Sequence, residues 1–104
     1  MVIKREVFEK IGYFDKRFFL YFEDVDFCLR VKRADLSLSV EPQSDVTHHT
    51  LIGAQKPLVV SLHLLKSNFI FINRWVPLLA RPFAYFYWLL LSSKILVGYF
   101  LKWI

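Results

Sequence analysis

Residues 12–30 read GYFDKRFFLYFEDVDFCLR and are the most informative stretch of the chain. Its first half is too aromatic and too often interrupted by charge for a solvated loop, so we expect it to pack across another surface of the protein. From Glu23 to Ala34 the sequence predicts a helix. The first turn of that helix carries Glu23, Asp24 and Asp26, and negative side chains there interact favourably with the positive end of the helix dipole.

The flanking segments predict an incomplete α/β domain. Arg5–Ile11 has apolar residues at helical spacing and is followed by Gly12, a frequent helix C-cap. Residues 1–4 read as the end of a strand, residues 36–40 alternate as a strand does, and residues 45–50 form another short extended piece. This order of elements describes part of an α/β domain, because the first strand has no neighbour in the sequence to pair with.

The three carboxylates at the predicted helix start have two interpretations. A carboxylate beside apolar surface can have its pKa raised, which is how enzymes tune a general base. The aromatic residues that precede Glu23 and Asp24 would supply such a surface. The alternative is an ordinary helix N-terminus, with Asp26 and Arg30 forming an exposed ion pair one turn apart.

The whole stretch resembles the signature GxFDxxFFxYxEDxDxxxR of bacterial family 2 glycosyltransferases, in particular their rhamnosyltransferase-like branch. Ten positions match it at fixed spacing: Gly12, Phe14, Asp15, Phe18, Phe19, Tyr21, Glu23, Asp24, Asp26 and Arg30. Residues 3–11 resemble the strand-to-helix lead-in of the family. Pro42 and His48 stand where the family has a proline and, six residues later, a histidine. The resemblance covers about half of the chain, residues 1–56.

The resemblance implies the C-terminal half of a GT-A (Rossmann-like) fold in residues 1–55 and an inverting transfer of a sugar. It implies that Asp24 is the general base that takes the proton of the acceptor hydroxyl, with Glu23 as its supporting neighbour. It also implies substrate contacts at four positions: Asp15, Phe19, Tyr21 and Arg30. His48 is the implied metal ligand, although a lone histidine after a strand is more often structural.

The sequence lacks the nucleotide-binding half of that family, with its metal-binding Asp-x-Asp. Asp24-Val-Asp26 has the same letters, but it belongs to the acidic motif at a helix start, so we do not assign it as the metal site. We therefore expect a divalent metal, Mg²⁺ or Mn²⁺, in an intact parent protein and not stably on this chain. As a fragment without its N-terminal half, the chain should be inactive alone; a separate chain that supplies this half is a further alternative.

Residues 56–104 form a basic, aromatic tail. Residues 51–104 hold six Lys or Arg and no acid, a net charge of +6, whereas residues 1–50 have a net charge of −1. If the tail is one helix, five basic residues fall within an arc of about 160°: Lys66, Arg74, Arg81, Lys94 and Lys102. A basic stripe opposite aromatic and leucine side chains is typical of a helix that lies in the interface of an anionic membrane.

Two membrane geometries are open for this tail. Residues 82–104 would extend about 34 Å as a helix, enough to cross a hydrocarbon core of about 30 Å. The distributed basic stripe favours a helix that lies flat. A pair of core helices that covers a sheet is the soluble alternative, and the lack of acids in the tail argues against it. No nucleic-acid partner is expected, because the charges are sparse and the aliphatic residues dense.

These observations predict a fragment of an inverting glycosyltransferase. The parent would move a sugar, with rhamnose expected, from a nucleotide-sugar to a lipid-linked saccharide in cell-envelope polysaccharide synthesis. We expect it at the cytoplasmic face of a bacterial inner membrane, as a peripheral or single-span protein. Cys28 is the one cysteine, which excludes an internal disulfide and fits a reducing compartment. The alternative is a small, non-catalytic, membrane-bound interaction protein derived from such an enzyme.

Overall fold

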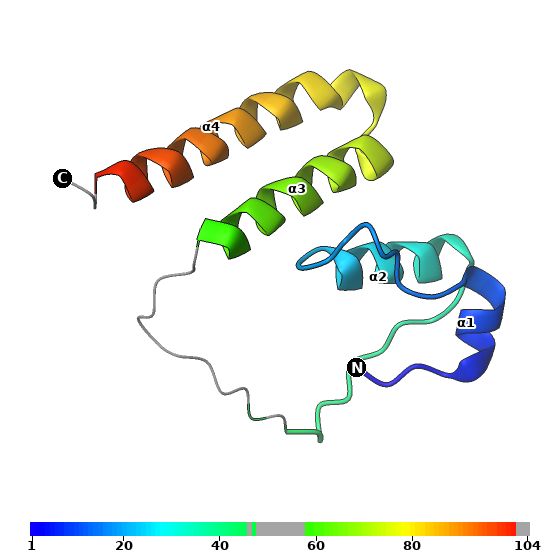
Figure 1. Ribbon diagram of the computed structural model, residues 1–104. Helices are drawn as coiled ribbons and strands as arrows, with labels where there is room; N and C mark the ends of the chain where they lie inside the picture. Colours follow the sequence, from blue (N-terminus) through cyan, green and yellow to red (C-terminus); the bar gives the residue numbers. More distant parts are fainter. Residues whose placement is uncertain (46, 48–57, 102–104) are drawn as a thin grey trace.

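The computed structural model describes residues 1–45, 47 and 58–101, and within these ranges the chain is helical (Figure 1). The helices, in chain order, are α1 (Arg5–Ile11), α2 (Glu23–Arg33), α3 (Leu58–Trp75), the short 3-10 helix η1 (Leu78–Ala80) and α4 (Arg81–Phe100). The structure confirms the helices expected at residues 5–11 and 23–34, the second of them ending one residue earlier.

The prediction of a partial α/β, GT-A (Rossmann-like) domain is wrong. The described residues contain no strand: residues 1–4 precede α1 without strand pairing, and residues 36–40 are equally unpaired. The third expected strand, residues 45–50, lies mostly outside the described residues. Alternating or extended sequence is not sufficient for a strand, because a strand is stabilised by ladder hydrogen bonds and side-chain packing against a neighbouring strand. The described chain offers no such neighbour to either segment.

Helices α1 and α2 form the smaller unit of the fold. Gly12 ends α1 with φ of 78°, and its N–H donates to the carbonyl of Phe8 at 2.8 Å. The ring of Phe8 packs against the ring of Phe27 on α2, with 5.5 Å between centroids. Phe27 is almost completely buried, so this aromatic contact is the centre of the α1–α2 pair.

Helices α3 and α4 form an antiparallel hairpin (Figure 1). Pro77 directly precedes η1, and the two helices are separated at this point. Pro82 lies in the first turn of α4, where its missing N–H has no helical partner in any case. The Trp88 indole N–H donates to the Leu65 carbonyl at 2.9 Å and so joins the two helices. A single helical register therefore does not extend through the tail. The four described basic residues of the expected stripe are divided between α3 and α4 and do not form one stripe, and Lys102 lies outside the described residues.

The three longest helices form layers, with α3 between α2 and α4 (Figure 1). The small apolar core is contributed by the loop before α2, by α2 and by α3, as follows: Phe18, Phe27, Val31, Leu65 and Ile72. No residue of α4, which is described throughout, is buried. One face of the hairpin therefore covers residues 12–30, which we call the acidic segment. The other face presents apolar side chains outward.

Candidate functional site

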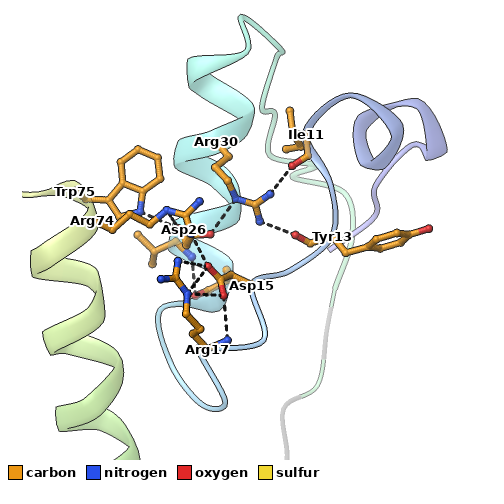
Figure 2. Close-up of polar contacts among 10 residues, drawn as sticks. Ile11, Tyr13, Asp15, Arg17, Asp26, Arg30, Arg74 and Trp75 are labelled. Carbon is orange, nitrogen blue, oxygen red and sulfur yellow. Dashed lines mark hydrogen bonds and ion pairs between the residues drawn. The ribbon is translucent and has the colours of Figure 1, made fainter.

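Asp26 is the centre of the polar network that joins α2 to α3 (Figure 2). Its side chain has an exposed fraction of 0%. One carboxylate oxygen accepts from the Arg30 Nε at 2.9 Å, and the other accepts from the Trp75 indole N–H at 2.8 Å. The Arg74 Nε lies 3.1 Å from this second oxygen. A buried carboxylate is tolerated only when it is paired and hydrogen-bonded, and Asp26 fulfils both conditions.

Arg30 extends the network to α1. Beyond its ion pair with Asp26, its two terminal nitrogens donate to the carbonyls of Ile11 and Tyr13, both at 2.8 Å. The planar guanidinium thus holds the C-terminal end of α1 against α2. The exposed i,i+4 pair that the sequence allowed as an alternative is instead a buried one, because Asp26 faces α3.

Asp15 is the second carboxylate of the network. It accepts from both the backbone N–H and the guanidinium of Arg17, and its Oδ2 also pairs with Arg74 of α3. The hydrogen bond from the Arg17 side chain lowers the pKa of Asp15 well below its usual value, with smaller contributions from the charges of Arg17 and Arg74. Arg74 therefore bridges two carboxylates, Asp15 in the loop and Asp26 in α2.

The turn that leads into α2 has an unusual backbone. Tyr21 and Phe22 have φ of 67° and 68°, a left-handed conformation that non-glycine residues rarely adopt. Helix α3 contacts this turn at two points. The Ser67 hydroxyl donates to the Leu20 carbonyl at 2.8 Å, and the rings of Phe22 and Phe71 lie 5.1 Å apart. The predicted packing of this loop across another surface is thus confirmed, and α3 provides the surface.

Glu23 and Asp24, the predicted catalytic pair, begin α2 directly after this turn. Asp24 is exposed, and its Oδ1 accepts the N–H of Val25 at 2.8 Å. Glu23 is half-buried, and its Oε2 is buried without a hydrogen-bond partner among the described residues. The three acids at the start of α2 therefore differ in environment: Asp26 is enclosed and paired, Glu23 is partly enclosed, and Asp24 faces outward.

The predicted substrate-binding residues divide into two kinds. The carboxylate of Asp15 and the guanidinium of Arg30 are engaged in the internal network described above. Phe19 is 75% exposed and packs on the ring of His63 at 4.7 Å between centroids, and Tyr21 is half-buried in the left-handed turn. Contact of these four residues with a substrate stays a prediction.

The metal ligand expected at His48 lies outside the described residues. In the part of the chain that the structure describes, no three His, Cys, Asp or Glu side chains are placed to hold a metal ion. Asp26 is unsuited to that role, because nitrogen donors already approach both of its oxygens. The described residues therefore do not fit a metal site.

Sequence reasoning missed the polar contacts that α3 makes with residues 12–30, which come from Ser67, Arg74 and Trp75. It placed Arg74 on a membrane-facing stripe, whereas the structure pairs it with Asp15 and Asp26. The sequence offered one indication of these contacts: if an acid of α2 faces the protein interior, it requires a cationic or N–H partner there. The sequence does not reveal which of the basic residues in the tail provides it.

Comparison with known proteins finds similarity over about half of the chain. The chain is 37% identical over 49 residues to the low-salt glycan biosynthesis hexosyltransferase Agl10 of Haloferax volcanii. It has the same identity over 49 residues to the N-acetylglucosaminyl-diphospho-decaprenol L-rhamnosyltransferase of Mycobacterium tuberculosis, in two strains. Each match covers 47% of this chain and 16% of the relative, so the chain spans only a small part of the relatives it matches. No family model and no solved structure matches the chain. The similarity supports a glycosyltransferase-like segment and leaves the donor and acceptor open.

Proposed function

We propose that this chain carries the acceptor-activating acidic segment of a membrane-associated, inverting glycosyltransferase. In the proposed reaction Asp24 takes the proton of the acceptor hydroxyl while that oxygen attacks the sugar carbon and the nucleotide diphosphate leaves from the opposite face. Glu23 supports Asp24 from the same helical turn. Asp26 has a structural role in this scheme, because it is the member of the triplet that both helices enclose.

The different exposure of the three acids carries this proposal. A general base must come within hydrogen-bond distance of the proton that it removes, which requires a side chain that a substrate can reach. Asp24 is exposed, whereas Asp26 has no exposed surface and is paired with arginine. The similarity to two named transferases supports glycosyl transfer as the reaction class.

A lipid-linked saccharide is the proposed acceptor. Helix α4 is the basis of this assignment, since the segment Leu78–Phe100 that contains it is long and apolar enough to cross a membrane, and no residue of α4 is buried. The name of the mycobacterial relative describes rhamnose transfer to a decaprenol-linked sugar, which supports rhamnose from a nucleotide donor and a polyprenyl-linked acceptor for this chain. We place the reaction at the cytoplasmic face of the membrane, where nucleotide-sugars are present.

We propose that α4 lies in the membrane interface rather than across the bilayer. Helix α3 packs along α4 and also binds the charged α2 through Asp26, so a spanning α4 would draw Lys66 and Arg74 of α3 toward the hydrocarbon. Each charged side chain at the bilayer centre costs about 2.5–3.5 kcal/mol. An in-plane α4 avoids this cost, and its exposed Lys94 can extend toward anionic headgroups.

The residues that the structure describes are not proposed to bind the donor. The reaction proposed here requires a pocket for the nucleotide-sugar and, for its diphosphate, a divalent cation. We infer that both are supplied by a longer parent protein or by a separate chain. The competing hypothesis is a non-catalytic, membrane-bound interaction protein, for which the outward apolar face of α4 would be the contact surface.

Two measurements on source-cell membranes test this proposal. A denaturing blot with an antibody against residues 14–30 gives the mass of the native product, which we expect well above 12.4 kDa. The same membranes are then assayed for transfer of labelled sugar from a nucleotide donor to extractable lipid. Asp24→Asn in the encoded protein should reduce transfer about 100- to 10,000-fold, the usual contribution of a general base.

The matched control is Asp35→Asn, which removes an exposed carboxylate from the turn after α2. Asp35 has φ of 55°, a conformation that Asn tolerates, so the fold should be unaffected. Undiminished transfer by the Asp24→Asn protein would refute the assignment of the base. A native band at 12.4 kDa together with membranes that lack transfer would favour the non-catalytic hypothesis.

A further inference from the structure

We propose that Arg74, assisted by Trp75, is a positioning residue for the general base: it fixes the start of α2, and with it Asp24, to the membrane-facing hairpin. This inference rests on the proposed function and deepens it. The geometry that supports it is the bridge that Arg74 makes between two carboxylates on separate segments of the acidic motif (Figure 2).

The bridge anchors one residue that precedes Asp24 in the sequence and one that follows it. Asp15 lies in the loop before the left-handed turn, and Asp26 lies two residues after Asp24 in the first turn of α2. Arg74 contacts one with its terminal nitrogen and the other with its Nε. Such a two-point contact uses the planar fork of a guanidinium and defines an orientation as well as a distance.

The left-handed turn makes this restraint necessary. Tyr21 and Phe22 both adopt a disfavoured backbone conformation immediately before Glu23, and such conformations persist only where the surrounding structure over-determines them. Ser67 and Phe71 of α3 hold the turn from one side, and Arg74 and Trp75 hold the first turn of α2. All four residues belong to α3, so this one helix restrains both the left-handed turn and the first turn of α2.

Asp24 itself depends on this support. Its side chain is exposed, and the hydrogen bond it makes is with the next residue in its own turn, so that bond does not fix its position relative to the rest of the protein. The position of the Asp24 carboxylate is therefore set by the backbone that precedes and follows Asp24, namely the left-handed turn and the first turn of α2. Because α3 also packs against α4, Arg74 links the position of the base to the element that we place in the membrane interface.

The principal experiment compares Arg74→Met and Arg74→Lys in the protein that is active in membranes. Arg74→Met should lower kcat about 100-fold, as expected for a reacting group displaced by about 1 Å, with an unchanged KM for the nucleotide donor. Arg74→Lys retains the charge but reaches one carboxylate at a time, so it should restore kcat in part. Lys32→Met is the matched control, since it removes an exposed charge from α2 itself and should leave kcat unchanged.

Hydrogen exchange on this 104-residue chain, bound to anionic vesicles, tests the restraint without reference to activity. The probe is the Asp26 amide, which donates to the Phe22 carbonyl at 2.9 Å across the turn. Arg74→Met should increase its exchange rate about tenfold or more, while amides of the α3–α4 hairpin are unchanged. Trp75→Phe keeps an aromatic side chain, although a smaller one, and removes the N–H donor to Asp26, so it should produce a smaller increase without loss of folding.

The outcomes separate the two proposals. A lower kcat at constant donor KM together with faster exchange at Asp26 supports Arg74 as a positioning residue. Unchanged exchange at Asp26 in both the Arg74→Met and the Trp75→Phe proteins overturns it, whatever the activity. An equal decrease of kcat for Met and Lys at position 74, with a raised donor KM, also overturns it. If the unmodified protein transfers no sugar while exchange responds as expected, the proposed function fails and the role of Arg74 as an anchor of α2 is retained.

Discussion

The indole N–H of Trp75 donates to the carboxylate of Asp26 at 2.8 Å and joins α3 to α2 across 49 positions of sequence. Trp75 also lies beneath the guanidinium of Arg33, which is centred 4.1 Å from its ring. One side chain at the end of α3 thus contacts both an acid and a base of α2. The acidic segment is therefore attached to the hairpin by directed polar contacts in addition to a few buried apolar residues.

Loss of the Asp26 carboxylate should destabilise the protein strongly. Asp26→Asn leaves Arg30 and Arg74 without their buried partner, and the removal of one member of a buried ion pair typically costs about 3–5 kcal/mol. Urea unfolding of the vesicle-bound chain, followed by tryptophan fluorescence, measures this change. Asp35→Asn should remain within about 0.5 kcal/mol of the unmodified chain, as surface substitutions do. Equal stability of the two variants would show that the network around Asp26 contributes little.

Acid should weaken the contact between the loop and α3 through Asp15. The pKa of Asp15 is lowered in the folded state, first by the hydrogen bond from Arg17, so the folded protein favours the ionised form. This stabilisation is complete above the unfolded pKa of about 4 and is lost as the pH falls from there toward the lowered pKa. Unfolding midpoints measured between pH 6 and pH 3 should therefore decline for the unmodified chain. Asp15→Asn should be less stable at pH 6 and decline less steeply; an identical pH profile would contradict the assignment.

The two ends of α4 should lie on the same side of the membrane. Leu79 in η1 and Leu101 flank α4 and are 91% and 65% exposed. An in-plane α4 places both at the same face of the membrane, whereas a spanning helix would separate them. Single cysteines at these positions in a Cys28→Ser background report the difference through an impermeant maleimide added to sealed, inside-out vesicles. Labelling of both Leu79→Cys and Leu101→Cys proteins is expected. Labelling of one only, with the other labelled after the vesicles are opened, would demonstrate a spanning helix.

Two glycine substitutions should have opposite effects. Gly12→Ala forces an alanine into φ of 78° at the end of α1, which should cost about 1 kcal/mol although its Cβ would meet no atom within 4 Å. Gly98→Ala lies inside α4, also with open space around the Cβ, and should stabilise that helix by about 0.5–1 kcal/mol. Thermal unfolding monitored by circular dichroism distinguishes the two. A loss of stability at Gly98 would indicate a close contact made by α4 in the membrane.

The local elements of this protein and its acidic motif follow from the sequence alone. The spacing of apolar residues and the position of Gly12 place α1 and its end, the acids at Glu23 mark the start of α2, and Pro77 divides the tail. These features depend on contacts within a few residues, namely helical hydrogen bonds, the helix dipole and the backbone restriction of proline. The same local reasoning failed for the α/β fold, because strand formation depends on a neighbouring strand that no local pattern guarantees.

Which charges meet is a result of the tertiary structure. In sequence, Arg74 belongs with four other basic residues of the tail, and Asp26 is one of three acids at a helix start. The reversal of the chain between α3 and α4 ends the common helical face, and the packing of α3 on α2 encloses Asp26 and pairs it with Arg74 and Trp75. Burial makes a partner obligatory for such a carboxylate, but which residue serves depends on how the helices pack. The exposure of Asp24 beside the enclosed Asp26 is likewise a result of that packing.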